Sequence, residues 1–185
     1  MSYSGIDTAV AAMRNGGVIA YPTEAVFGLG CDPDNHVALT SLLALKQRPA
    51  SKGLILIAAE VSQLQPYIAQ VDTTLQQRAL DTWPGPVTWL FPCAKQIDPL
   101  LSGDHDTIAV RVTAHPIARE LCLAFGKAIV STSANLSGQA PARTVAEVEV
   151  QFADRLAAIV EGQVDLGAQP SEIRELVSNK VIRSA

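Results

Sequence analysis

Segments with strand-like and helix-like hydrophobic patterns alternate along the whole chain, and this alternation is the feature that most restricts its fold. Apolar runs of strand length lie at 18–21, 54–57, 87–91, 108–112 and 128–131. Segments with helical patterning separate them, at 6–13, 37–45, 62–69, 72–80, 116–125 and 144–152. Weaker strands are predicted at 157–160 and 180–183. Because interleaved strands and helices pack as helices against a shared sheet, we predict an α/β fold with a mixed sheet.

Nothing in the sequence divides this pattern into two domains. The chain has 185 residues, of which 48% are apolar and 17% charged, a composition that supports one well-buried core. It contains no Ser/Gly-rich linker, no block of charge and no internal repeat. We therefore expect a single domain over residues 1–185, with one twisted sheet and flanking helices.

The composition also argues against several classes of protein. The first residues lack a basic segment followed by an apolar one, and the longest apolar stretch, 54–59, is too short to span a membrane. The three cysteines are far apart and the three histidines lack metal-ligand spacing, so we expect buried thiols and no metal site. A net charge of −4 argues against a generally basic surface for nucleic acids. We therefore predict a soluble, cytoplasmic protein.

Common nucleotide-binding and hydrolase motifs are absent, and small polar residues gather instead where predicted strands end. The sequence contains no GxxxxGK[ST], GxGxxG, GxSxG or HExxH motif. The run STSANLSG at 131–138 follows a strand directly, and its hydroxyl and backbone N–H groups are suited to phosphate or carboxylate oxygens. The alternative is a turn that satisfies only its own backbone. In YPTEAVFGLG at 21–30, a glycine-rich loop is predicted, where Gly28 and Gly30 permit positive φ or close approach of a ligand.

Basic residues cluster in a stretch that lacks acidic ones. Between positions 34 and 60 there is no Asp or Glu, whereas Lys46, Arg48 and Lys52 fall close together. They form either an anion site or a solvated helix end, where the helix dipole favours cations. Arg111 lies within the apolar strand 108–112, so its guanidinium must face an anion, pair internally or reach solvent.

Taken together, these segments resemble the YrdC/Sua5 family, and within it the short bacterial members. The resemblance covers essentially the whole chain, in order. It implies a YrdC-like α/β fold with a large concave basic cavity, and an enzyme of transfer-RNA modification. It rests on YPTEAVFGLGCDP at 21–33, LKQRP with a following lysine at 45–52, WPGPVT at 83–88, AVRVTAHP at 109–116, STSANLSG at 131–138 and SEIRELVSNKVIR at 171–183.

The family resemblance implies synthesis of L-threonylcarbamoyl-adenylate from L-threonine, bicarbonate and ATP, with release of pyrophosphate. Such an enzyme is a nucleotidyltransferase, and Mg²⁺ would be carried by the ATP phosphates. Other proteins would then transfer the threonylcarbamoyl group to adenosine 37 of ANN-reading tRNAs, which gives N6-threonylcarbamoyladenosine. Besides these downstream proteins, tRNA or double-stranded RNA is an expected partner at the basic cavity.

Carried over residue by residue, the resemblance implies catalytic roles for Lys46 and Arg48. The implied ATP site consists of Arg48, Lys52, Thr107, Ser133, Asn135, Pro141 and Arg183. The implied threonine site consists of Thr23, Arg111, Ser131 and Ser171, with Arg111 paired to the threonine carboxylate. Two positions depart from the pattern of many relatives and concern amino-acid contact: Ala25 stands in place of a threonine, and Ile57 in place of a histidine.

Two other functions compete with this one. A non-catalytic RNA-binding module acting in tRNA or rRNA maturation is the alternative hypothesis. The net charge of −4 and an aromatic content of 5% disfavour it, because single-stranded RNA binders stack bases on aromatic side chains. A carbamoyl transferase of the hydrogenase-maturation type is the third, but this sequence lacks the zinc-finger and acylphosphatase-like segments of those larger chains.

Overall fold

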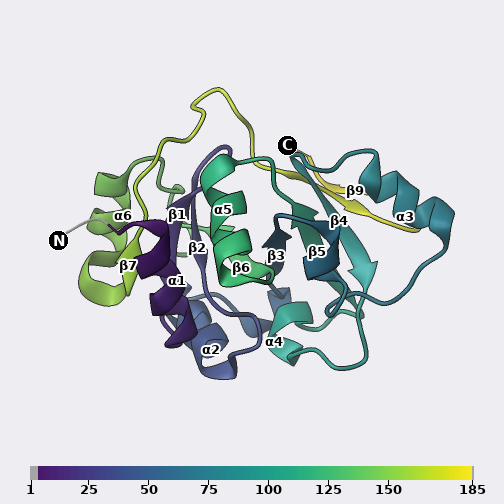
Figure 1. The fold of residues 1–185 in the computed structure, drawn as a ribbon, viewed down its shortest axis with the longest axis horizontal. Helices are drawn as coiled ribbons and strands as arrows, with labels where there is room; N and C mark the ends of the chain where they lie inside the picture. The colour runs from purple at the N-terminus through teal and green to yellow at the C-terminus, as the bar shows by residue number, and fades with distance from the viewer. Residues whose placement is uncertain (1–3, 185) are drawn as a thin grey trace.

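One mixed sheet runs through the protein, with helices on both of its faces (Figure 1). The computed structural model describes residues 4–184. Its strands are β1 (Ile19–Pro22), β2 (Phe27–Gly30), β3 (Ile55–Ala58), β4 (Val87–Pro92), β5 (Thr107–Val112), β6 (Ile129–Ser133), β7 (Ala158–Ile159), β8 (Glu172–Glu175) and β9 (Val181–Arg183). Within residues 4–184 they join in the order β7-β1-β2-β6-β3-β5-β4-β8-β9. The pairs β1/β7, β3/β5 and β4/β8 are parallel and the others antiparallel, which confirms the predicted mixed sheet.

The helices lie between the strands in sequence, as the alternating pattern predicts. They are α1 (Ile6–Arg14), α2 (His36–Lys46), α3 (Thr73–Leu80), α4 (Pro99–Ser102), α5 (Pro116–Phe125) and α6 (Val145–Phe152), with short 3-10 helices η1 (Ala50–Lys52), η2 (Val61–Leu64) and η3 (Ala153–Arg155). None of the helices within residues 4–184 is long and apolar enough to cross a membrane. The α/β class is therefore confirmed.

The predicted helix at 62–69 is wrong over most of its length. Only η2 forms at the start of this segment, and it ends at Leu64. Pro66 follows two residues later, and a proline both lacks an N–H donor and disfavours helical geometry in the residue before it. The chain then continues without a regular helix until α3 begins at Thr73.

Two strands depart from the sequence-based prediction. β2 occupies part of the segment predicted as a glycine-rich loop, and it pairs with both β1 and β6. Gly30 is there for packing, because a Cβ atom at this position would lie 2.7 Å from the Val130 carbonyl oxygen and 2.8 Å from the Tyr21 ring. β8 was not predicted, because its sequence EIRE is mostly charged, and it forms by parallel pairing with β4.

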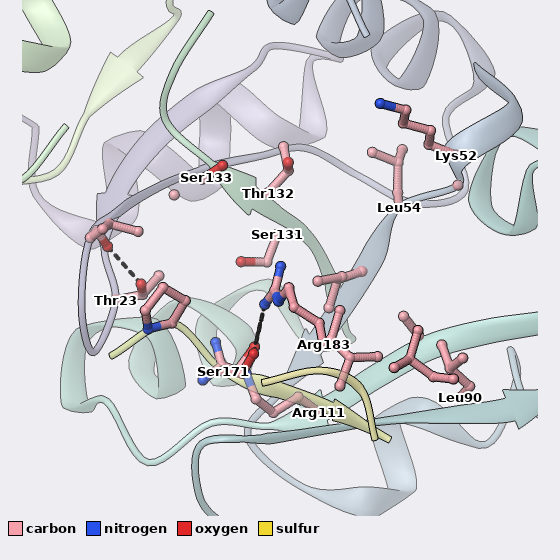
Figure 2. Close-up of a pocket in the computed structure, with 18 of the residues that line it drawn as sticks. Thr23, Lys52, Leu54, Leu90, Arg111, Ser131, Thr132, Ser133, Ser171 and Arg183 are labelled. Atoms are coloured by element: carbon pink, nitrogen blue, oxygen red, sulfur yellow. Dashed lines mark hydrogen bonds between the residues drawn. The ribbon is translucent and has the colours of Figure 1, made fainter. Parts of the chain in front are cut away.

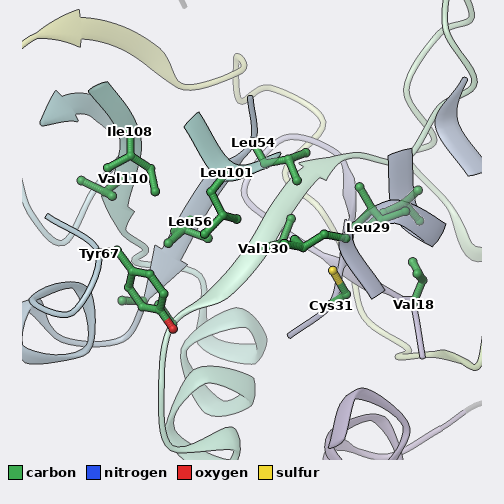
Figure 3. Packing of buried hydrophobic residues seen from close by; sticks show 14 of the residues in the cluster. Val18, Leu29, Cys31, Leu54, Leu56, Tyr67, Leu101, Ile108, Val110 and Val130 are labelled. Atoms are coloured by element: carbon green, nitrogen blue, oxygen red, sulfur yellow. The ribbon is translucent and has the colours of Figure 1, made fainter. Parts of the chain in front are cut away.

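Alternate side chains of the central strands point to opposite faces of the sheet. On one face Leu56, Val110 and Val130 are fully buried cross-strand neighbours (Figure 3). They belong to one hydrophobic cluster with side chains of α2 and α6. Burial of each such side chain contributes about 1.5–3 kcal/mol. This face of the sheet therefore carries the main hydrophobic core.

The opposite face is covered only in part. Helices α1 and α5 lie side by side over it (Figure 1), and Tyr21, Ile57 and Ile129 pack beneath them. Two residues before Ile57 on β3, the same face presents Ile55, which pairs with Ser131 of β6. Ile55 and Ser131 line a cavity, so the helices leave one part of this face open.

Candidate functional site

A cavity of about 450 Å³ lies on the part of the sheet that α1 and α5 leave uncovered. Strand β5 contributes Thr107, Ala109 and Arg111, because alternate residues share a face, whereas Val110 between them lies in the core. The last three residues of β6, Ser131, Thr132 and Ser133, all line the cavity. The volume falls in the range of roughly 300–1,000 Å³ that is typical of small-molecule sites.

The C-terminal segment forms a second wall of the cavity. β7 forms one edge of the sheet, and the chain then crosses to the opposite edge, where β8 and β9 follow β4. Arg183 on β9 donates from Nη2 to the Ser171 carbonyl oxygen at 2.7 Å and to the Ser171 Oγ at 3.3 Å. Thr88 Oγ1 also donates to Ser171 Oγ, at 3.0 Å. Figure 2 shows Arg183 pointing from this wall toward Ser131 on β6.

Most of the side chains predicted for the two substrate sites lie around this one cavity. Lys46 and Asn135 are not among its lining residues. The predicted residues that do line it are Thr23, Arg48, Lys52, Thr107, Arg111, Ser131, Ser133, Pro141, Ser171 and Arg183. They come from both halves of the chain, and their contacts with particular substrates stay predictions.

Lys46 is buried behind the cavity wall and not at a solvated helix end. Its side chain is 4% exposed, and its Nζ donates to the carbonyl oxygen of Ser133, to that of Asn135 at 2.9 Å and to Asn135 Oδ1 at 3.3 Å. Ser133 Oγ in turn donates to Asn135 Oδ1 at 2.6 Å. Burial, with a smaller effect of Arg48, lowers the pKa of Lys46 to about 8. Lys46 therefore contacts Ser133, which lines the cavity, and Asn135, which does not.

The charged side chains that line the cavity are mostly cationic. Arg48, Lys52, Arg111 and Arg183 line it, and Glu24 is the one acidic lining residue in the part of the chain described. Within residues 4–184, no carboxylate lies at salt-bridge distance from Arg48, Lys52 or Arg183. Burial lowers the pKa of Arg48 and of Arg183, and a neighbouring arginine lowers each further. Cations held near one another without carboxylates form a site for a polyanion.

Arg111 makes the internal ion pair that was one of its predicted alternatives. Its Nη1 lies 2.8 Å from Glu24 Oε2, and Thr113 Oγ1 donates to Glu24 Oε1 at 2.7 Å. Arg111 Nε is buried without a hydrogen-bond partner among the described residues. Sequence reasoning assigned no role to Glu24 or Thr113, although Glu24 lies beside Thr23 and Thr113 alternates with Arg111.

Three positions that concern amino-acid contact are also placed by the structure. The Thr23 hydroxyl donates to the Val26 carbonyl oxygen at 2.6 Å, so toward a ligand it acts as an acceptor. Ala25 lines the cavity. Ile57 is fully buried in the cluster under α1 and α5 and does not line the cavity, so this departure from the family pattern lies in the core.

The predicted buried thiols are confirmed for two of the three cysteines. Cys31 and Cys122 are buried, and burial raises the pKa of each to about 12, whereas Cys93 is partly exposed. Within residues 4–184, no group of three or more His, Cys, Asp or Glu side chains is placed to hold a metal ion.

Comparisons with known proteins cover nearly the whole chain. The model of the Sua5/YciO/YrdC family, described as "Telomere recombination", matches residues 11–185. A protein from Photobacterium profundum named threonylcarbamoyl-AMP synthase is 56% identical over 176 residues, which are 94% of this chain and 95% of the relative.

Solved structures give the same assignment. E. coli YciO has a TM-score of 0.85 and 28% identity, over 97% of this chain and 88% of that one. P. abyssi Sua5 complexed with L-threonine has a TM-score of 0.86 and 30% identity, over 92% of this chain. The present chain spans 50% of the P. abyssi chain. By sequence and by fold, the protein belongs to the Sua5/YciO/YrdC family.

Proposed function

We propose that this protein synthesises L-threonylcarbamoyl-adenylate from L-threonine, bicarbonate and ATP and releases pyrophosphate. The observation that carries the proposal is a single cavity that combines a cluster of cations with serine and threonine hydroxyls. A relative named threonylcarbamoyl-AMP synthase and the threonine complex of Sua5 support it. These relatives favour an enzyme over the non-catalytic RNA-binding alternative.

The cationic part of the cavity suits the triphosphate of ATP. Arg48 and Arg183 offer planar guanidinium groups, which grip phosphate oxygens in pairs, and Lys52 offers a point charge. Ser133 would contact the α-phosphate or the ribose, with Asn135 holding it from behind the cavity wall and Thr107 and Pro141 beside the nucleotide. Mg²⁺ would enter with the nucleotide and be held by phosphate oxygens and water.

The other part of the cavity suits an amino acid. Arg111 would pair with the carboxylate of L-threonine, and Ser131, Ser171 and Thr23 would surround the rest of the molecule. Gly28 keeps this space open, because a Cβ atom there would lie 3.2 Å from Thr23 Cγ2 and 3.5 Å from Ser131 Oγ. The absence of a side chain at Gly28 leaves room for the substrate between those two residues.

The proposed reaction joins the two parts of the cavity. The threonine amine and bicarbonate first form a carbamate and water, and a carbamate oxygen then attacks the α-phosphorus in line. The bond between the α-phosphorus and the bridging oxygen breaks, and pyrophosphate leaves with that electron pair. Such a step depends on alignment and on neutralising phosphate charge, which this chain's arginines and lysines supply.

The product is a mixed anhydride, so a group-transfer reaction must consume it. We propose that separate transfer proteins pass the threonylcarbamoyl group to adenosine 37 of ANN-reading tRNAs. Contact of tRNA with the basic cavity belongs to the same proposal.

Pyrophosphate release from ATP tests the function. The wild-type protein is assayed with and without L-threonine and bicarbonate, and with L-serine and L-alanine as control amino acids. We expect release that requires both threonine and bicarbonate. Release without bicarbonate would indicate direct amino-acid adenylation, and no release under any combination would contradict the proposal.

A further inference from the structure

The Arg111 guanidinium is only partly satisfied by the protein. Its side chain is 8% exposed, and Nη1 is held by Glu24, yet the buried Nε has no partner among the described residues. A buried donor without a partner costs stability, and that cost is relieved if a ligand oxygen reaches it. Nε itself is shielded from the cavity, but Arg111 lines the cavity and Glu24 is paired only with Nη1, so a carboxylate bound there can accept from the rest of the guanidinium.

Glu24 offers the opposite charge at the same place. Its side chain is 22% exposed and lines the cavity, and its carboxylate accepts one hydrogen bond from Arg111 and one from Thr113. Burial acts to raise the pKa of Glu24, but Arg111 and the Thr113 hydroxyl outweigh it, so the pKa lies below its usual value. Glu24 is therefore ionised at neutral pH, and its two oxygens keep lone pairs free for another donor.

The ion pair presents a negative and a positive group side by side, within 2.8 Å. An α-amino acid carries a carboxylate and an ammonium on one carbon, so its two charges are complementary to this pair. A carboxylic acid without the amine would meet the Arg111 donor but also the negative charge of Glu24. The site thus discriminates by charge pattern as well as by shape.

We propose that Glu24 is a specificity-determining residue that binds the ammonium group of the amino-acid substrate while Arg111 binds its carboxylate. This inference rests on the proposed function and names a residue for its amino-acid site. Carboxylation first needs the ammonium to release one proton to solvent, and a second proton leaves in the water formed from bicarbonate. The nitrogen then keeps one N–H for Glu24, and the new carboxylate is repelled by Glu24 and attracted toward Arg48, Lys52 and Arg183. Glu24 therefore also orients the carbamate toward the proposed phosphate site.

The test compares two ligands that differ only in the amine. L-Threonine and (R)-3-hydroxybutanoate share carboxylate, hydroxyl and methyl group, and their dissociation constants are measured by calorimetry with the full chain. We expect the wild type to bind threonine at least about 100-fold more tightly, which is the range of a buried charge-assisted interaction. Equal binding of the two ligands by the wild type would overturn the proposal without any variant.

Glu24→Gln removes the charge and keeps the size of the side chain. We expect the preference for threonine over (R)-3-hydroxybutanoate to fall at least about tenfold, mainly through weaker threonine binding, with ATP binding changed less than about twofold. Glu24→Asp keeps the charge and should recover part of the preference. A uniform loss for both ligands, or an aspartate variant no better than the glutamine variant, would reduce Glu24 to a support for Arg111.

Glu172→Gln is the matched control. Glu172 is 24% exposed and pairs with Arg174, but it does not line the cavity. Its substitution should leave the preference between the two ligands unchanged. The proposed function is tested separately by pyrophosphate release from the wild type, so release together with an unchanged preference in Glu24→Gln would overturn only the role of Glu24.

Discussion

Replacing Lys46 with methionine should destabilise the protein and slow the proposed reaction together. The Lys46 ammonium is the donor that holds the end of β6 and the residues after it, through Ser133 and Asn135. Methionine keeps an unbranched apolar stem of similar length but donates no hydrogen bond. The substitution therefore removes the three hydrogen bonds with little change in volume.

The expected loss of stability follows from which acceptors lose their last donor. The Ser133 carbonyl oxygen also accepts from Asn135 N at 3.0 Å, and Asn135 Oδ1 also accepts from Ser133 Oγ. The Asn135 carbonyl oxygen has only Lys46 among the donors described. Leaving this partly buried acceptor unsatisfied costs about 2 kcal/mol. For a chain of this length, that lowers Tm by about 4–8 °C.

Thermal unfolding and pyrophosphate release are measured on the same preparations. A shift of about 1 Å in Ser133 or Asn135 would lower kcat by about 100-fold. Arg48→Met is the comparison, because Arg48 follows two residues later and lines the cavity, with hydrogen bonds to Gly53 O at 3.1 and 3.3 Å. It should mainly raise KM for ATP. If Lys46→Met kept the wild-type Tm and kcat, the hydrogen bonds of Lys46 to Ser133 and Asn135 would not position the residues at the end of β6.

Further perturbations test other parts of the structure. Burial lowers the pKa of Lys46 from 10.5 to about 8, so between these values the unfolded chain binds more protons. As pH rises through this window, the free energy of unfolding of the wild type should increase relative to that of Lys46→Met by up to about 1.4 kcal/mol per pH unit, measured by urea titration. A difference that does not change with pH would contradict the burial of the Lys46 charge. Arg111→Ala should raise KM for threonine by about 100-fold and leave KM for ATP nearly unchanged in steady-state assays; the reverse pattern would exchange the two sites. Gly30→Ala should cost about 1–3 kcal/mol in denaturant unfolding, because its Cβ would lie 2.7 Å from Val130 O, whereas Gly5→Ala, with no atom within 4 Å, should cost less.

The sequence predicts correctly those elements whose first and last residues are marked by local signals such as proline and glycine. The predicted helix at 116–125 matches α5. Pro116 occupies the first turn, where its missing N–H is not needed, and Gly126 ends the helix in the left-handed conformation. The alternation of β5 likewise predicts which side chains share a face, and it places Arg111 away from the core of apolar residues between β5 and α2.

Elements that depend on distant partners could not be predicted in this way. β2 contains two glycines, which are depleted in strands, and it forms because β1 and β6 both pair with it. β8 is a charged segment that gains its conformation from β4. In both cases tertiary pairing decides the structure, and a local pattern carries no information about that partner.

The candidate site shows the same limit at the level of single side chains. The clustering of Lys46, Arg48 and Lys52 in sequence predicts a shared environment, and two of the three do line the cavity. Lys46 differs because it is the last residue of α2 and faces the loop after β6, far away in the chain. Spacing alone treats the three cations as equivalent, whereas burial separates Lys46, which lies behind the wall, from Arg48 and Lys52, which line the cavity.

Arg111 shows that an internal ion pair and a ligand contact are compatible in one side chain. A guanidinium has five N–H donors arranged around a plane, and Glu24 pairs only with Nη1, which leaves other donors of the group for a ligand. The pair as a whole is neutral, so a lone anion gains little from it, because the attraction of Arg111 is offset by the repulsion of Glu24. A zwitterion meets both charges favourably. In the proposed function, Glu24 thereby gives the amino-acid end of the cavity a charge pattern distinct from that of Arg48, Lys52 and Arg183, which have no carboxylate at salt-bridge distance among the described residues, and this difference would keep threonine and the triphosphate in separate places.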